Sequence, residues 1–221
     1  MAWVWLALAF VLAVVNWYAV AREKRILRVV TKPGVMLALL AGFTLAGGWS
    51  GHNYWFGLGL AFSLVGDVLL MLPPGAFMAG LAAFLVAHIL YILGFSQGLT
   101  FPGWSLLFLI AVLAAADFFI YRRLRRALLA RHKGRWMRLP MHFYQIIISL
   151  MVITALMTLW RADWSRTGAW LASLGALCFF ASDSLLANNR FVNPIRGGRL
   201  LVIITYHIGQ AALISGALLR G

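Results

Sequence analysis

Long apolar stretches alternate with short polar links along the whole sequence. Runs long enough to cross the roughly 30 Å of bilayer hydrocarbon occupy residues 3–21, 33–49, 54–72, 77–97, 103–121, 140–160, 166–187 and 199–219. No long linker or low-complexity tract separates these eight runs. The pattern predicts an all-α polytopic membrane protein with eight transmembrane helices, in which residues 1–221 form a single integral membrane domain.

Composition supports the same class. Apolar residues make up 63% and charged residues 11% of the 221 positions, and the mean hydropathy is +0.91. Soluble domains average about 45–50% apolar and 25% charged residues, so a soluble protein is excluded. The one cysteine, Cys178, lies in an apolar run and excludes an internal disulfide. The first run is followed rather than preceded by basic residues, so we expect a retained helix and not a secretory signal.

The basic residues fall on one side of the predicted membrane domain. Sixteen of the nineteen Lys and Arg lie in links 22–32, 122–139 and 188–198 and at Arg199, and the other three are Arg161, Arg166 and Arg220. The positive-inside rule then predicts a cytoplasmic basic side and both termini outside. The formal charge of +14 is therefore a topology signal and an attraction to anionic lipid, and we expect no nucleic-acid partner.

Tryptophans gather near the opposite, outer helix ends, as an interfacial belt does. They are Trp3, Trp5, Trp49, Trp55, Trp104, Trp160, Trp164 and Trp170.

Two carboxylates interrupt the apolar runs in matched settings. Asp67 in segment 62–71 and Asp183 in segment 179–186 share the pattern small residue, Asp, any residue, Leu, Leu. An ionisable group inside the membrane costs roughly 2.5–3.5 kcal/mol and indicates a functional site. Each lies about one turn before the basic end of its helix, so we expect both at one level in the cytoplasmic half. Four helices separate them, which predicts a weak 4+4 parallel repeat.

The helices that follow the two carboxylates also resemble each other. His88 and Tyr91 come after Asp67, and Tyr206 and Gln210 come after Asp183 at similar distances. Two carboxylates facing one cavity can share a proton and serve as an acid and a base. The alternative is that each Asp caps a helix end or pairs with an arginine near the headgroups.

Other sites have less support in the sequence. A zinc site needs three convergent ligands; His88, His207 and an Asp would supply them, but no HxxxH spacing is present. We therefore expect no metal and no cofactor. Asp117 is expected to pair with Arg122 or Arg123, and Asp163 to be solvated in an outer loop.

The motifs resemble those of the YhhN family of membrane proteins, which includes the lysoplasmalogenases. The matching segments are Phe62–Pro73, Phe77–Tyr91, Gly175–Phe191, Thr205–Gln210 and Thr31-Lys32-Pro33. One departure is His207, where the family pattern has a second aromatic residue, usually Tyr. The resemblance implies an eight-helix enzyme that hydrolyses the vinyl ether bond of lysoplasmalogens to a fatty aldehyde and glycerophosphoethanolamine or glycerophosphocholine.

With that reading, Asp67 and Asp183 are the predicted catalytic residues. The predicted substrate-binding residues are Lys32, His88, Tyr91, Asn189, Tyr206 and Gln210. We expect Asp67 to be the acid and Asp183 the base, because Asp183 precedes the donor-rich link Asn188–Arg190. Lys32 and the basic links are expected to meet the substrate phosphate.

The expected partners are a lysophospholipid substrate and membrane lipids, in a bacterial cytoplasmic membrane; the sequence makes no prediction of oligomeric state. Two other classes remain open. Paired intramembrane carboxylates are also typical of a proton-coupled or lipid transporter, and a lipid-binding scaffold would not need either Asp for activity.

Overall fold

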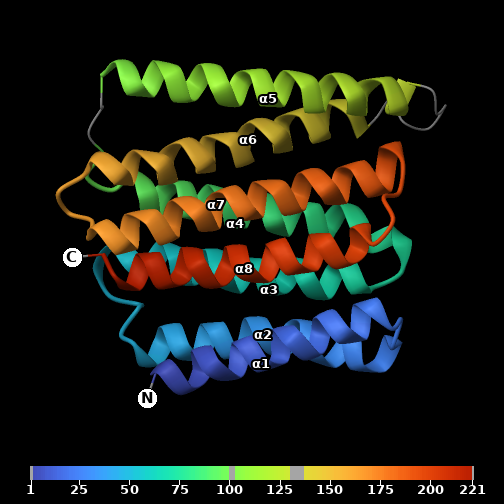
Figure 1. Cartoon of the computed structure of the whole chain (residues 1–221), viewed down its shortest axis with the longest axis horizontal. Coiled ribbons are helices and arrows are strands. Elements are labelled where there is room, and N and C mark those ends of the chain that lie inside the picture. The colour runs from blue at the N-terminus through green and yellow to red at the C-terminus, as the bar shows by residue number, and fades with distance from the viewer. Residues whose placement is uncertain (1, 100–102, 130–136, 221) are drawn as a thin grey trace.

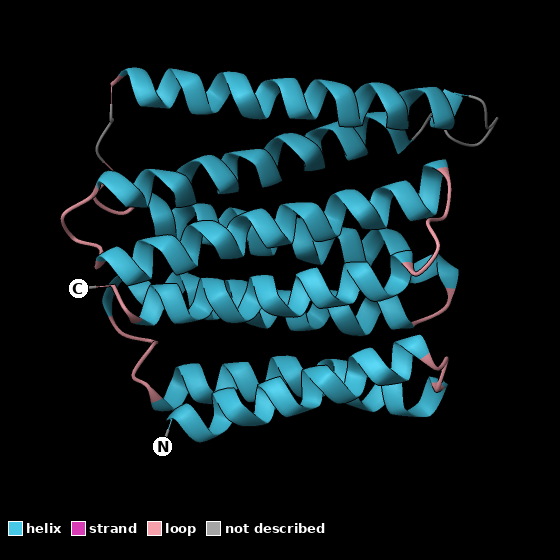
Figure 2. Cartoon of the chain, in the orientation of Figure 1, coloured by secondary structure: helices cyan, strands magenta, loops and turns pink. Residues whose placement is uncertain are grey.

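The computed structural model describes residues 2–99, 103–129 and 137–220, and these residues are helical apart from short turns and links (Figures 1 and 2). Within that part of the chain the helices are α1 (Ala2–Ala21), α2 (Arg25–Leu45), α3 (Tyr54–Met71), α4 (Phe77–Ser96), α5 (Trp104–Leu129), α6 (Arg138–Met157), α7 (Arg166–Ala187) and α8 (Gly198–Leu218). Seven of the described helices, all except α5, are long and apolar enough to cross a membrane, against the eight spans that were predicted. The predicted all-α membrane fold is confirmed.

The eight helices run side by side along one common direction, with α1 and α2 at one edge and α5 and α6 at the other (Figure 1). Consecutive helices form the hairpins α1–α2, α3–α4 and α7–α8, and α8 also contacts α1, α2 and α3. This last set of contacts brings the end of the chain back against its beginning. Both termini lie at the same end of the bundle (Figure 1).

The α7–α8 hairpin is closely packed because glycines face each other across it. A Cβ atom on Gly175 would lie 2.8 Å from the backbone oxygen of Gly209, and one on Gly216 would lie 2.7 Å from that of Gly168. Small residues allow such close approach in membranes, where helix association depends on packing. The contact fixes the position of α8 relative to the helix that carries Asp183.

Two helices are longer than the hydropathy pattern predicts. The second begins at Arg25 and not at residue 33, because Pro33 lies inside α2 without ending it; helix-breaking prolines are tolerated in membranes where neighbours satisfy the freed backbone groups. Asn16 of α1 bonds the Arg28 carbonyl at 3.2 Å and the Thr31 hydroxyl at 2.8 Å. The predicted link 22–32 is therefore mostly helix.

The fifth helix continues to Leu129 rather than ending at residue 121. Arginine is a good helix former, and Leu124 and Leu128 are buried beneath the arginines of this extension. Most of the basic charge that was expected in link 122–139 therefore lies on helical turns. Residues 130–136 of that link lie outside the described ranges.

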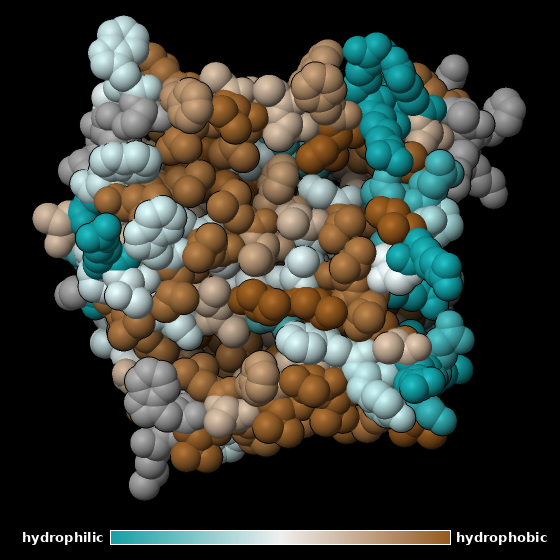
Figure 3. Space-filling model, in the orientation of Figure 1, coloured by the Kyte–Doolittle hydropathy of each residue, from teal (hydrophilic) through white to brown (hydrophobic). Residues whose placement is uncertain are grey.

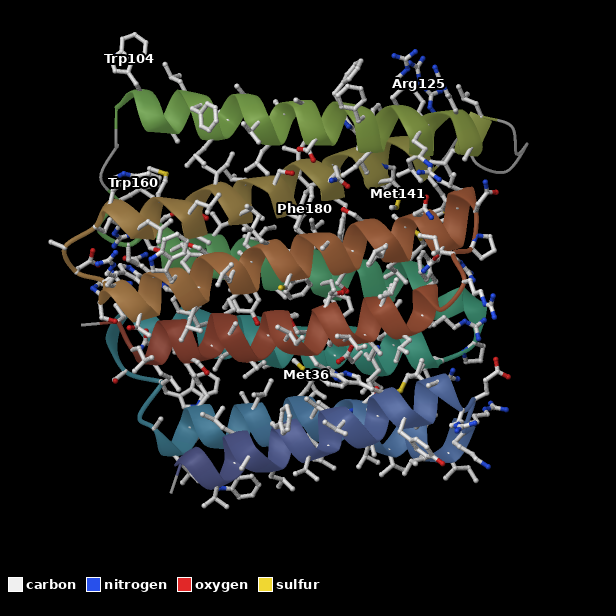
Figure 4. The ribbon with its side chains drawn as sticks, viewed as in Figure 1. Met36, Trp104, Arg125, Met141, Trp160 and Phe180 are labelled. Atoms are coloured by element: carbon white, nitrogen blue, oxygen red, sulfur yellow. The ribbon has the colours of Figure 1, made fainter. Side chains whose placement is uncertain are left out.

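Polar and aromatic residues divide between the two ends of the bundle. Hydrophilic side chains cover the end where α2, α6 and α8 begin (Figure 3), with Arg125 at that end and Trp104 and Trp160 at the other (Figure 4). Trp104 is 86% exposed, as expected of a belt residue. Trp164 is different: it is buried against Phe56 and Phe95 and does not face lipid.

A cluster of charged groups closes the end that holds both termini. Asp163 is bonded by Arg161, at 2.9 Å and 2.6 Å, and by Arg220. Arg161 also donates to the carbonyls of Phe95 and Gln97 at the end of α4. Partial burial raises the pKa of Asp163, but the hydrogen bonds from Arg161 and Arg220 lower it more, so the pKa lies below its usual value of 3.8. Asp163 is 42% exposed, as expected of a solvated loop residue, and it also connects three helix ends through the two arginines.

Candidate active site

Asp67 is held by two side chains that come from distant parts of the chain. Its carboxylate, 1% exposed, forms an ion pair with Lys32 of α2, with 2.8 Å between Nζ and Oδ1. The Tyr206 hydroxyl of α8 donates to Oδ2 at 2.8 Å. Lys32 Nζ also lies 5.8 Å from the centre of the Tyr206 ring, within cation–π range. Lys32, expected to meet the substrate phosphate, is therefore engaged by Asp67.

Asp183 has a different pair of neighbours. The Tyr144 hydroxyl of α6 donates to Oδ2, and Nε2 of His88 on α4 lies 3.7 Å from the same oxygen. The Asp183 side chain is 11% exposed, whereas His88 is fully buried. Among the described residues, no Lys or Arg pairs with Asp183.

The contacts around the two carboxylates follow the predicted repeat. Each Asp meets one side chain from the helix before its own: Lys32 of α2 for Asp67, and Tyr144 of α6 for Asp183. Each also meets one side chain from the last helix of the opposite half, Tyr206 of α8 and His88 of α4 respectively. The two halves therefore complete each other's carboxylate sites.

Tyr144 is a site residue that reasoning from the sequence missed. It lies in an apolar run with no motif around it. The signal that would have found it is the repeat itself, because Tyr144 precedes Asp183 by 39 residues as Lys32 precedes Asp67 by 35. If the two halves are also compared over the helix that precedes each Asp, Tyr144 is found at the position that corresponds to Lys32.

Aromatic rings connect the two carboxylate sites. The Phe179 ring lies 4.7 Å from the His88 ring and 5.5 Å from the Tyr206 ring, centre to centre. The chain of contacts thus runs from Asp183 through His88, Phe179 and Tyr206 to Asp67. In the described residues the two carboxylates share no hydrogen-bond partner.

The other predicted binding residues, Tyr91, Gln210 and Asn189, form hydrogen bonds with groups other than the two carboxylates. Tyr91 and Gln210 are fully buried and bond each other at 2.8 Å instead of either carboxylate. Asn189 lies in the link after α7, where its side-chain oxygen accepts from the Ile195 backbone N–H at 2.9 Å. Asn188 bonds the Asn193 carbonyl at 2.9 Å. The Asn188–Arg190 link does not supply the donors that were expected for Asp183.

Asp117 and His207 have partners other than those considered from the sequence. Asp117 accepts a hydrogen bond from Gln145 of α6 at 2.8 Å and forms no ion pair with Arg122 or Arg123 in the described residues. The His207 ring nitrogen Nδ1 accepts a hydrogen bond from the Trp17 indole at 3.2 Å. Throughout the part of the chain that was searched, no three His, Cys, Asp or Glu side chains are arranged to hold a metal ion.

Several buried polar atoms near the carboxylates lack a protein partner. In the described residues they include both ring nitrogens of His88, the Ser63 hydroxyl and the Gln210 side-chain nitrogen. Buried polar groups are nearly always satisfied by protein, water or ligand. The region therefore has unused donors and acceptors for water or for the polar part of a substrate, next to two carboxylates and an imidazole.

The sequence is similar to one protein family and to several curated relatives. The sequence model described as "YhhN family" matches residues 27–217. The chain is 34% identical over 170 residues to the lysoplasmalogenase TMEM86B of Mus musculus, covering 76% of this chain and 66% of the relative. It is 33% identical over 159 residues to the Homo sapiens protein of the same name, covering 72% and 61%.

A bacterial relative is similar over a comparable length. The lysoplasmalogenase of Mycobacterium bovis is 29% identical over 164 residues, covering 71% of this chain and 58% of the relative. The chain thus spans 58–66% of the length of these curated relatives, which is less than two thirds. No solved structure matches it.

Proposed function

The chain belongs to the YhhN family, and from this premise we propose that it is a lysoplasmalogenase. The reaction adds water across the vinyl ether bond of a lysoplasmalogen and releases a fatty aldehyde and a glycerophospho-alcohol. The observation that carries the proposal is that the family match, residues 27–217, contains every side chain that meets Asp67 or Asp183.

The chemistry of a vinyl ether explains why two buried carboxylates suit this reaction. A proton is added to the β-carbon of the double bond, which leaves an oxocarbenium ion at the carbon attached to oxygen. Water attacks that carbon and loses a proton, and the resulting hemiacetal separates into aldehyde and alcohol. The steps need a proton donor, a base for water and negative charge near the developing cation.

We assign the proton donor to Asp183 and the anionic role to Asp67, in the opposite order to the expectation from sequence. Lys32 supplies the counter-charge that Asp67 needs as an anion. Asp183 has a hydroxyl and an imidazole as neighbours and no cation partner in the described residues. Tyr144 and His88 orient the donor, while Asp67 stabilises the oxocarbenium ion and accepts the proton from water.

The activity is tested directly with purified protein in detergent. We expect aldehyde from lysoplasmenylethanolamine and none from 1-acyl lysophosphatidylethanolamine, which has an ester in place of the vinyl ether. Because no membrane gradient exists in detergent, a transporter would release no aldehyde there. Absence of aldehyde from a folded preparation would contradict the proposal.

We further propose that both termini lie outside and that the basic end of this single membrane domain faces the cytoplasm. Both ends of the described chain lie opposite the basic end (Figures 1 and 3), so a cytoplasmic basic end, which the positive-inside rule favours, puts both termini outside. In a Cys178→Ala background, we expect Lys24→Cys and Arg196→Cys to resist an impermeant thiol reagent in intact cells. Ser50→Cys, at the opposite end, is the control and should react; the reverse labelling pattern would invert the orientation.

A further inference from the structure

The basic end of α5 carries a group of arginines that the site described above does not use. Arg122, Arg123, Arg125 and Arg126 are all exposed on the last turns of this helix. None of them forms an ion pair with a carboxylate in the described residues. Guanidinium groups without a carboxylate partner are suited to an anionic ligand, because arginine matches phosphate with several parallel hydrogen bonds; which of the four could share one ligand depends on the face of α5 that each lines.

Two hollows lie beside these arginines, on two faces of α5, and Arg122 and Arg126 line both of them. One, of about 490 Å³, is lined by Phe119, Arg122, Arg123, Arg126, Ala127 and Val192. The other, of about 590 Å³, is lined by Phe118, Tyr121, Arg122, Arg125, Arg126 and Leu129. Arg123 belongs only to the first hollow and Arg125 only to the second, and Arg125 lies at the basic end of α5 (Figure 4).

The first hollow is next to the helix that carries Asp183. Val192 ends η5 (Asn188–Val192), a π-helical turn that continues α7 directly after Ala187, and α5 packs against this turn. Single π-helical turns occur frequently at functional sites. Asp183 is also the more accessible carboxylate, 11% exposed against 1% for Asp67.

Depth along the helices agrees with the dimensions of the substrate. Asp117 of α5 bonds Gln145, the neighbour of Tyr144, which in turn bonds Asp183. Arg122 to Arg126 lie five to nine residues beyond Asp117, or about 7–13 Å nearer the basic end. In a lysoplasmalogen, five bonds of about 1.5 Å each separate the ether oxygen from phosphorus, so a vinyl ether near Asp183 puts the phosphate within reach of these side chains.

We propose that the hollow lined by Arg122, Arg123 and Arg126 binds the phosphate group of the lysophospholipid substrate. The assignment rests on the proposed lysoplasmalogenase function and replaces Lys32, which is engaged by Asp67. The arginines hold the phosphate at the basic end, Phe119 and Val192 contact the apolar part of the lipid, and the vinyl ether extends along α7 to Asp183.

The test compares Arg123→Gln with Arg125→Gln, two exposed arginines of one helix that line different hollows. We expect Arg123→Gln to raise the KM for lysoplasmenylethanolamine roughly tenfold, the effect of losing one charge-assisted hydrogen bond, with kcat unchanged. Arg125→Gln removes the same charge and should leave KM unchanged. With 1-alkenylglycerol, which has no phosphate, both variants should match the wild type.

A binding measurement separates failure of this site from failure of the proposed function. A 1-O-alkyl lysophospholipid has the phosphate but no vinyl ether, and its affinity can be measured whether or not the protein makes aldehyde. Weaker binding by Arg123→Gln than by Arg125→Gln supports the phosphate site even if no substrate turns over. Equal effects of the two changes, or an equal loss with 1-alkenylglycerol, would overturn it.

Discussion

The variants Asp67→Asn and Asp183→Asn should each form aldehyde from lysoplasmenylethanolamine about 10²–10⁴-fold more slowly than the wild type, the usual contribution of acid–base catalysis. Asn keeps the shape of the side chain and removes both the transferable proton and the negative charge. The Asp183→Asn variant would lose the donor bonded to Tyr144, and Asp67→Asn the anion paired with Lys32. The measurement is steady-state kinetics of purified variants whose folding is checked by thermal unfolding.

The double variant and a third carboxylate sharpen this test. Because residues that act as one unit are not additive, Asp67→Asn/Asp183→Asn should be little slower than either single change. Asp117→Asn is the matched control: Asp117 is also a helical carboxylate, but it bonds Gln145 and neither carboxylate site. Near-normal turnover by a folded Asp67→Asn or Asp183→Asn variant would end the two-carboxylate mechanism.

Replacing Lys32 with Met should destabilise the folded protein by roughly 3–5 kcal/mol, because it leaves the buried charge of Asp67 without its partner. The ion pair is 2.8 Å long, and its side chains are 15% and 1% exposed. A lower unfolding temperature in detergent is the expected observation. The loss of aldehyde formation should accompany it, since the anionic role proposed for Asp67 depends on Lys32.

A second change, at Asp67, shows whether the broken ion pair causes the loss of stability in Lys32→Met. The variant Lys32→Met/Asp67→Asn carries neither charge and should unfold at a higher temperature than Lys32→Met alone. Lys32→Arg keeps the positive charge and is the control for a change of side-chain shape. If the two single effects simply add in the double variant, Lys32 does not stabilise the protein through Asp67.

Local properties of the sequence were enough to predict the helices and the position of each carboxylate about one turn before the end of its helix. Hydrocarbon thickness demands about 20 apolar residues for each span, so the eight runs correspond to the eight observed helices. The errors lie at two helix ends. The helix α2 begins earlier than predicted because Pro33 is tolerated within it. The helix α5 ends later than predicted because Leu124 and Leu128 are buried. Both depend on neighbouring helices, which hydropathy does not describe.

The apolar runs also identified the two carboxylates of the candidate site, because a carboxylate inside such a run is costly unless it has a use. The sequence did not determine their partners. Lys32 is engaged by Asp67, and Tyr144, with no motif around it, bonds Asp183. Only the tertiary structure decided these pairings, because each carboxylate is completed by helices more than twenty residues away in the chain, and their approach depends on packing across the bundle and not on any local pattern.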